Sequence, residues 1–158
     1  MRSVSNTFTK LHVFTDIYKK EIVEMQTMTE IIVKQEDIDH LGHVNYLKYI
    51  YYLELGMGDW YRQAGVSMDE LSEKNLGTVL INIDLSYLKE ARLGDTLKVI
   101  TSLSKVGNKS FVLKQDIYNS VDVQITDCRK TFVMFDTIAR KSTPVVDEIT
   151  CHFNPIKN

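Results

Sequence analysis

The chain changes its hydrophobic period once along its length, and this change constrains the fold more than any other feature. Between residues 45 and 64, apolar side chains recur at steps of three and four, which is typical of an amphipathic helix. After Gly77 the period becomes two, which is typical of strands with one buried face. The change predicts an α+β fold, in which one long helix packs on a mainly antiparallel sheet.

The other expected elements follow from the same patterns. A β-branched run predicts a strand over residues 28–34, ahead of the helix. Gly65 is the expected stop of the long helix, and Ser67 is expected to cap a short second helix that ends at Lys74. Later strands are predicted over residues 79–85, 97–103, 111–117 and 123–137. The breaks between these four strands, at 94–95, 107–109 and 119–122, predict hairpin or near-hairpin connections.

The chain divides into a short extension, residues 1–26, and one domain, residues 27–158. A length of 158 residues is near the typical size of a single domain. Within the extension, apolar residues recur at helical spacing and favour a short helix; they are Leu11, Phe14, Tyr18, Ile22 and Met25.

Composition excludes several classes of function. A net charge of -2 provides no basic field for nucleic acid, so nucleic acid is not an expected partner. The two cysteines, Cys128 and Cys151, are too few for a disulfide framework and favour a reducing compartment. No signal-peptide core and no long apolar span is present, so the sequence predicts a cytoplasmic protein without membrane partners.

Candidate chemistry gathers in one turn, residues 37–45, directly ahead of the long helix. Asp39 would stand close to the start of the helix, where free backbone N–H groups can polarise a carbonyl oxygen. Asp39 could instead be an N-cap, although Asn45 is better placed for that role. His43 could orient Asp39 or be a structural histidine, and Gly42 would let the backbone approach a ligand closely.

A metal site is a weaker interpretation of the same turn. Asp37, Asp39, His40 and His43 include the ligand types that metals use, but no second cluster follows to complete a site. The sequence also lacks a nucleophile elbow, a phosphate-binding glycine loop and a dinucleotide fingerprint. We therefore expect neither a metal nor an organic cofactor.

The turn also carries a family signature. Asp37-x-Asp39-x-x-Gly42-His43-Val44-Asn45, followed by Tyr49 and Glu54, resembles the hotdog-fold thioesterases of the 4-hydroxybenzoyl-CoA and acyl-ACP type. The later segments 87–89, 94–97 and 107–111 are similar to the central sheet of that family. The resemblance covers about residues 29–136. It implies a hotdog fold with one long helix on a curved sheet, in a homodimer or homotetramer with sites at subunit interfaces.

The resemblance also implies the chemistry. Asp39 matches the carboxylate that acts as nucleophile or general base on the thioester, the Tyr46 amide matches the group that holds the carbonyl oxygen, and His43 matches the histidine of the pattern. The expected substrate is an acyl-CoA or an acyl carrier protein thioester. Substrate contacts are expected from Gly42, Val44, Asn45 and Glu54, and from Lys109 and Arg129 as cations for the nucleotide end of CoA.

Two alternatives to hydrolysis remain open from the sequence. The turn could hold an acyl thioester without cleaving it, in a non-catalytic binding protein. The same fold could instead add water to an acyl thioester or remove it, as a hydratase or dehydratase. Release of free thiol distinguishes hydrolysis from both.

Overall fold

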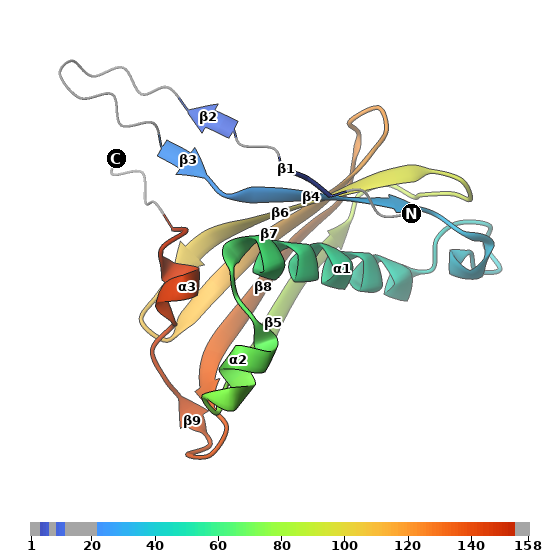
Figure 1. The fold of residues 1–158 in the computed structure, drawn as a ribbon. Coiled ribbons are helices and arrows are strands. Elements are labelled where there is room, and N and C mark those ends of the chain that lie inside the picture. Colours follow the sequence, from blue (N-terminus) through green and yellow to red (C-terminus); the bar gives the residue numbers. More distant parts are fainter. Residues whose placement is uncertain (1–3, 7–8, 12–21, 154–158) are drawn as a thin grey trace.

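The computed structural model describes residues 4–6, 9–11 and 22–153. Most of its strands form a main sheet around a central helix, and residues 9–11 and 22–24 pair as a separate two-stranded sheet (Figure 1). The helices are α1 (Tyr46–Ala64), α2 (Met68–Glu73), α3 (Asp147–Thr150) and the short 3-10 helix η1 (Gln35–Asp37). The strands are β1 (Val4–Asn6), β2 (Thr9–Leu11), β3 (Ile22–Glu24), β4 (Gln26–Ile32), β5 (Leu76–Tyr87), β6 (Thr96–Val106), β7 (Ser110–Asn119), β8 (Gln124–Asp136) and β9 (Lys141–Ser142).

Seven strands form one antiparallel sheet in the order β1-β4-β6-β7-β8-β5, with β9 paired to β8. The sheet curls around α1, which crosses it and contacts β4, β6 and β7 (Figure 1). The predicted α+β class, with one long helix packed on an antiparallel sheet, is confirmed. None of the helices in the described ranges is long and apolar enough to cross a bilayer.

Helix α1 begins and ends where the sequence predicts. The Asn45 side chain accepts a hydrogen bond from the Leu47 N–H at 2.9 Å, which is the usual N-cap arrangement. Gly65 closes the helix with a φ of +76°, a left-handed conformation that favours glycine. The Ser67 cap of α2 is also present, because the Ser67 hydroxyl accepts from the Glu70 N–H.

Gly56 brings α1 close to the sheet. A Cβ atom at this position would stand 2.6 Å from Cγ1 of Val99 on β6, so no larger residue fits without movement. Trp60 is fully buried further along the same helix. The core lies between α1 and the concave face of the sheet, and it fixes the position of the helix start.

Strand β5 differs from its prediction in two ways. Its alternation predicts one buried face and a hairpin to the next strand, but β5 pairs with β8, at the opposite end of the main sheet from β4. The connection from β5 to β6 therefore crosses between separated strands. Contacts of α1 with the sheet concentrate on β4, β6 and β7. Four apolar side chains of β5 consequently stay between 38% and 59% exposed, and they are Val79, Leu80, Ile81 and Ile83.

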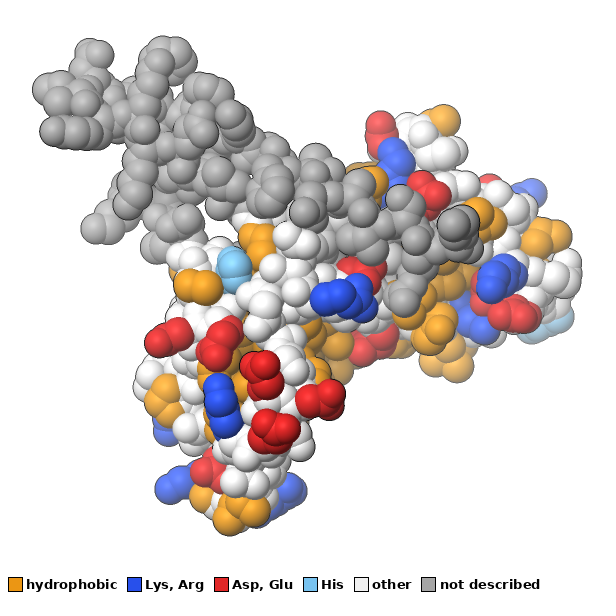
Figure 2. All heavy atoms as spheres, in the orientation of Figure 1, with side chains coloured by type: hydrophobic (Ala, Val, Ile, Leu, Met, Phe, Trp, Pro, Cys, Tyr) orange, Lys and Arg blue, Asp and Glu red, His pale blue; other side chains and the backbone are white. Residues whose placement is uncertain are grey.

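The ends of the chain hold elements that the sequence pattern did not show. The helix favoured for residues 11–25 falls largely on residues 12–21, which lie outside the described residues; the described flanks are strands β2 and β3. Residues 141–142 form β9 and residues 147–150 form α3, and neither element was predicted from the sequence. Acidic side chains gather over α2, while charged and apolar side chains mix around the start of α1 (Figure 2).

Candidate active site

The turn ahead of α1 is closed by its own hydrogen bonds. The Asp39 N–H donates to the His43 carbonyl at 3.0 Å, and the Gly42 N–H donates to the Asp39 carbonyl at 3.0 Å. Gly42 has a φ of +84°, which permits this tight return of the chain. The Asp39 side chain accepts one hydrogen bond, from the Leu41 N–H at 2.9 Å. Asp39 is thereby oriented by the turn without being buried.

The start of α1 presents a free amide beside this turn. Tyr46 is the first residue of the helix, so its N–H has no partner within the helix. The next two amides, of Leu47 and Lys48, both donate to Asn45. Among the residues that the structure describes, no acceptor stands opposite the Tyr46 N–H. This amide can therefore hold an oxygen of a bound molecule, assisted by the helix dipole.

Asp39, His43 and Tyr46 line one cavity of about 370 Å³. Its walls come from the turn, from the start of α1, and from the end of β5 with the segment that follows it. The residues are Asp39, Leu41, His43, Val44, Tyr46, Tyr49, Tyr87, Leu88, Lys89 and Glu90. Of these residues, the sequence predicted Asp39, His43, Val44 and Tyr46 as part of the site. It did not predict Leu41, Tyr49 or residues 87–90. The β5–β8 pairing directs those residues toward the turn, and the Leu88 and Lys89 N–H groups continue it by donating to Ile125 at the start of β8.

Two tyrosines fix the shape of the cavity. The Tyr49 hydroxyl accepts from the Ala91 N–H at 2.9 Å, and the Tyr87 hydroxyl donates to the Tyr46 carbonyl at 3.1 Å. Their rings meet edge to face at 5.5 Å. Burial raises the pKa of Tyr49, so its phenol stays neutral at physiological pH. The Val44 N–H donates to the Ala91 carbonyl and ties the turn to the same segment.

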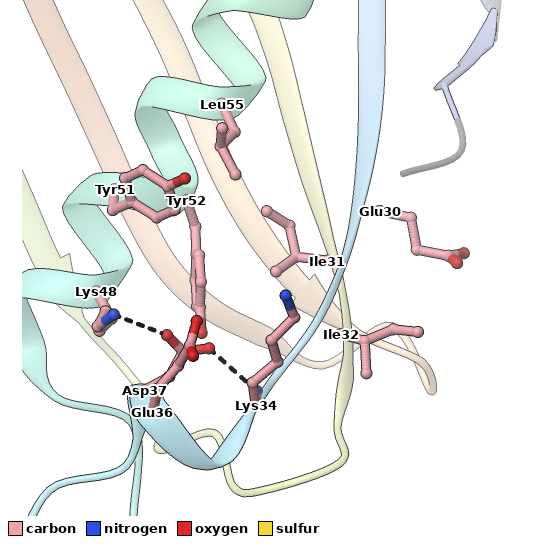
Figure 3. A pocket seen from close by; sticks show the side chains of 10 residues that line it. All are labelled: Glu30, Ile31, Ile32, Lys34, Glu36, Asp37, Lys48, Tyr51, Tyr52 and Leu55. Atoms are coloured by element: carbon pink, nitrogen blue, oxygen red, sulfur yellow. Dashed lines mark hydrogen bonds and ion pairs between the residues drawn. The ribbon is translucent and has the colours of Figure 1, made fainter. Parts of the chain in front are cut away.

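Asp37 lies on the other side of the turn and is held firmly. It is 6% exposed, its Oδ2 accepts from the Lys34 N–H at 3.0 Å, and its Oδ1 pairs with Lys48 Nζ at 3.0 Å. Figure 3 shows Asp37 between Lys48 and Lys34, joined to both by dashed lines, in a second cleft of about 390 Å³ that Tyr52 also lines. Burial favours the neutral acid, but these hydrogen bonds and Lys48 outweigh it and hold the pKa of Asp37 below its usual value.

The remaining predicted contact residues are spread over the molecule. The Asn45 side chain caps the helix, and Val44 lines the cavity. Glu54 faces the sheet from the middle of α1, where it pairs with Lys130 of β8. Lys109 lies in the turn between β6 and β7, and Arg129 pairs with Asp127; neither lines the cavity.

Strand β8 carries two buried residues with reactive groups, Lys130 and Cys128. Lys130 is 0% exposed, and its alternation with Cys128 and Phe132 is the sequence signal that could have placed it on the buried face. Cys128 is also buried, and burial raises the pKa of its thiol to about 11. This thiol is therefore protonated and unsuited to act as a nucleophile. In the described residues no group of three or more His, Cys, Asp or Glu side chains could hold a metal ion.

A curled antiparallel sheet around one long helix is the hotdog fold, and comparisons with known proteins agree with this class. The model of the Thioesterase-like superfamily matches residues 33–153. The long-chain acyl-CoA thioesterase FadM of Escherichia coli K12 is 29% identical over 122 residues, which cover 77% of this chain and 92% of FadM. The acyl-CoA thioester hydrolase YbgC of Escherichia coli O6:H1 is 24% identical, over 77% of this chain and 90% of YbgC.

Solved structures show the same fold. Slr0204, a 1,4-dihydroxy-2-naphthoyl-CoA thioesterase from Synechocystis, superposes with a TM-score of 0.75 over 80% of this chain and 94% of its own, at 16% identity. The chain belongs to the Thioesterase-like superfamily, and the predicted hotdog family is thereby confirmed. The superfamily match includes the whole turn, α1 and the segment that lines the cavity.

Proposed function

We propose that this protein hydrolyses an acyl-CoA thioester to a free acid and CoA. The observation that carries the proposal is the shared cavity of Asp39 and Tyr46, one offering a carboxylate and the other a free helix amide. FadM and YbgC, the relatives named as acyl-CoA thioesterases or hydrolases, support CoA as the thiol. Because the names of relatives include both a long-chain and a dihydroxynaphthoyl substrate, they leave the acyl group open.

In the proposed reaction the thioester carbonyl oxygen accepts a hydrogen bond from the Tyr46 N–H. Asp39 then either removes a proton from a water molecule that attacks the carbonyl carbon, or attacks that carbon itself to form an anhydride that water cleaves. Either route breaks the carbon–sulfur bond. In the first route the departing thiolate takes back the proton that Asp39 removed from water; in the second the thiolate leaves as the anhydride forms, and it is protonated by the proton released when water cleaves the anhydride. Negative charge develops on the carbonyl oxygen, where a single oriented donor contributes about 3–4 kcal/mol.

His43 contributes a polar group to the same cavity. Its Nδ1 lies 3.3 Å from the Val44 carbonyl, and this contact directs the ring from within the turn. We assign His43 to hydrogen bonding with the attacking water or the leaving sulfur. Gly42 allows the turn to close, and Val44 forms part of the wall, so both serve the substrate through the shape of the site.

Substitution of Asp39 tests the proposal directly. Asp39→Asn keeps the size of the side chain and its acceptor for Leu41, but removes the base. We expect kcat for thiol release from acyl-CoA to fall by about 10²–10⁴-fold. Glu36→Gln, in the same segment and exposed, is the matched control and should keep wild-type turnover. Unchanged turnover in Asp39→Asn would remove Asp39 from the mechanism, and tight binding without thiol release would favour a non-catalytic binder.

We also propose that the active unit is a homodimer formed through β5. Within the described residues this strand has a free edge, and its exposed apolar side chains form a surface that monomers rarely leave open. Pairing two copies of β5 around a two-fold axis would continue the sheet and cover these side chains. Tyr87 and Leu88, at the end of β5, line the cavity, so a partner at this edge would also help to close the site.

A charge placed on this edge tests the dimer. Ile81 is 59% exposed, so Ile81→Lys costs the isolated chain little but would place two like charges in the paired interface. Light scattering should show a dimer for the wild type and a monomer for the variant at the same concentration. Arg129→Ala, on the interior strand β8, should leave the mass unchanged. A wild-type chain that stays monomeric at micromolar concentration would overturn this part of the proposal.

A further inference from the structure

The inner face of β5 carries a row of apolar side chains that α1 leaves uncovered. Residues that stand opposite each other on antiparallel strands point to the same face of a sheet. Alternate residues of β8 are buried on the concave face beside α1, so their partners on β5 share this face. These partners are Tyr87, Leu85, Ile83 and Leu80, which we call the inner row. Leu85 is half-buried, and the other three side chains are 38% to 47% exposed.

The inner row begins at the candidate active site. Tyr87 lines the cavity, and its hydroxyl donates to the carbonyl of Tyr46 at the start of α1. Two turns further along the same stripe of the helix, Glu54 pairs with Lys130 of β8. The partner of Lys130 on β5 is Ile83, a member of the inner row. Helix and strand are therefore connected at two points, one at the cavity and one at the Glu54–Lys130 pair.

The two connections are equally far apart on the helix and on the strand. From Tyr46 to Glu54 the helix advances by eight residues, or about 12 Å. From Tyr87 to Ile83 the strand runs four residues, or about 13 Å. The inner row thus lies beside α1 over this whole interval, from the free helix amide to the ion pair.

Lys130 places a charge on an otherwise apolar surface. Its side chain is 0% exposed, and its neighbours across the strands are Leu113 on β7 and Ile83 on β5. Among the residues that the structure describes, Glu54 is its ion-pair partner, and the Glu54 side chain remains 46% exposed. A buried charge is costly without its partner, so Lys130 holds Glu54 at this position. The pair interrupts the apolar surface between Ile83 and Leu80, the last member of the inner row.

We propose that the acyl chain of the substrate lies along the inner row and that the Glu54–Lys130 pair sets its maximum length. This inference rests on the proposed hydrolysis and names its substrate class. With the thioester carbonyl at the Tyr46 N–H, an interval of about 12 Å holds about nine carbons, since an extended chain with bonds of about 1.5 Å advances about 1.3 Å per carbon. A longer chain would cover the exposed side of the Glu54 carboxylate and remove its water. The substrate is therefore a medium-chain acyl-CoA.

A partner subunit would complete this acyl site without moving its end. The proposed pairing of β5 edges places a second copy beside the inner row, where it would close the open side of the acyl site. Tyr46, Glu54 and Lys130 belong to one chain, so the distance from the carbonyl position to the ion pair is fixed within each protomer. The alternative occupant of the inner row is the partner itself, and in that case acyl length would not affect the reaction.

A series of saturated acyl-CoAs tests the length limit. The kcat/KM of thiol release is measured from butanoyl- to hexadecanoyl-CoA, at concentrations below those that form micelles. We expect kcat/KM to rise about twofold or more per added methylene up to about nine carbons, because each methylene buries apolar surface. From decanoyl- to hexadecanoyl-CoA it should stay level or fall. A rise that continues to hexadecanoyl-CoA would overturn the limit, and equal values throughout would assign the inner row to the partner.

Replacement of both members of the pair tests its role. Glu54→Leu combined with Lys130→Met removes the two charges together, because a single replacement would leave the other charge unpaired. The apolar surface would then continue to Leu80, and the ratio of kcat/KM for tetradecanoyl- over octanoyl-CoA should increase about 10-fold or more. An unchanged ratio in the folded double variant would contradict the role of the pair. The wild-type series decides the length limit whether or not this variant folds.

A second ion pair provides the matched control. Lys74, at the end of α2, pairs with Glu148 of α3, and neither residue belongs to the inner row or to the cavity. Lys74→Met combined with Glu148→Leu makes the same two replacements there and should keep the wild-type ratio. An equal increase in this control would show that the change in length preference does not come from the Glu54–Lys130 pair.

Binding separates this inference from the proposed function. Affinities of the same acyl-CoAs for Asp39→Asn, measured by calorimetry, should rise up to about nine carbons and then level off. If the wild type releases no thiol while the affinities follow this profile, hydrolysis fails and the length limit stands. If thiol is released but neither rates nor affinities level off, the length limit fails and hydrolysis stands. A protein that binds acyl-CoA of no length would overturn both.

Discussion

Asp37 and Asp39 lie two residues apart in one turn, and the fold uses them in opposite ways. Asp37 is buried, and both of its carboxylate oxygens are bound, one to the Lys34 amide and one to Lys48. Asp39 is partly exposed, bonds only to the Leu41 amide of its own turn and faces the cavity. The first carboxylate anchors the turn to α1. The second one is left available for the reaction that we propose.

Substitution of Asp37 should give the largest change in stability, whereas substitution of Asp39 should give the largest loss of turnover. Asp37→Asn removes the charge that holds Lys48 and weakens the bond to the Lys34 amide. We expect the free energy of unfolding to fall by about 2–3 kcal/mol, as for hydrogen bonds to a buried charge. Urea unfolding at one protein concentration measures this loss. The Asp39 carboxylate is not buried, so Asp39→Asn should have a free energy of unfolding close to that of the wild type.

A crossed result would overturn the division of roles between the two carboxylates. If Asp37→Asn abolished turnover at a temperature where it remains folded, with stability unchanged, then Asp37 would belong to the chemistry. If Asp39→Asn lost stability as Asp37→Asn does, then Asp39 would belong to the scaffold.

Acidification gives a smaller effect with a defined sign. The folded-state pKa of Asp37 lies below its ordinary value of 3.8, so the unfolded chain takes up a proton before the folded protein does. The stabilisation is therefore fully present above about pH 4 and is lost as the pH falls through the folded pKa. The gap in unfolding free energy between wild type and Asp37→Asn should be constant from pH 7 to pH 5 and shrink at pH 3. A gap that widens at pH 3 would show that the ionised Asp37 carboxylate is not the source of this stabilisation.

The fold was largely predictable because local patterns decided it. Helix α1 has a continuous apolar stripe, a cap at Asn45 and a stop at Gly65, and all three agree with the structure. Strands β6, β7 and β8 form where apolar and polar residues alternate in the sequence, because one face of each strand is buried in the core. The place of β5 was not predictable, since its pairing with β8 depends on a connection that carries no local signal.

The candidate site was predictable only in its contiguous half. Sequence placed Asp39, His43 and Tyr46 together because they lie within eight residues of one another. It could not bring Tyr87 to this site, because that contact depends on long-range pairing. Nor could it distinguish Asp37 from Asp39 by burial, since the two have the same chemistry and differ only in which side of the turn meets the helix.

The proposed mechanism requires the amide at the start of α1 and the carboxylate of Asp39 to act on the same thioester, and one pair of variants isolates the amide. Tyr46→Pro removes the N–H that Tyr46→Ala retains. Proline is well tolerated at the first position of a helix, and Asn45 before it is already extended, with ψ of 139°. Steady-state thiol release should give a kcat about 10²–10³-fold lower for Tyr46→Pro than for Tyr46→Ala. Equal kcat values in two folded variants would contradict the mechanism.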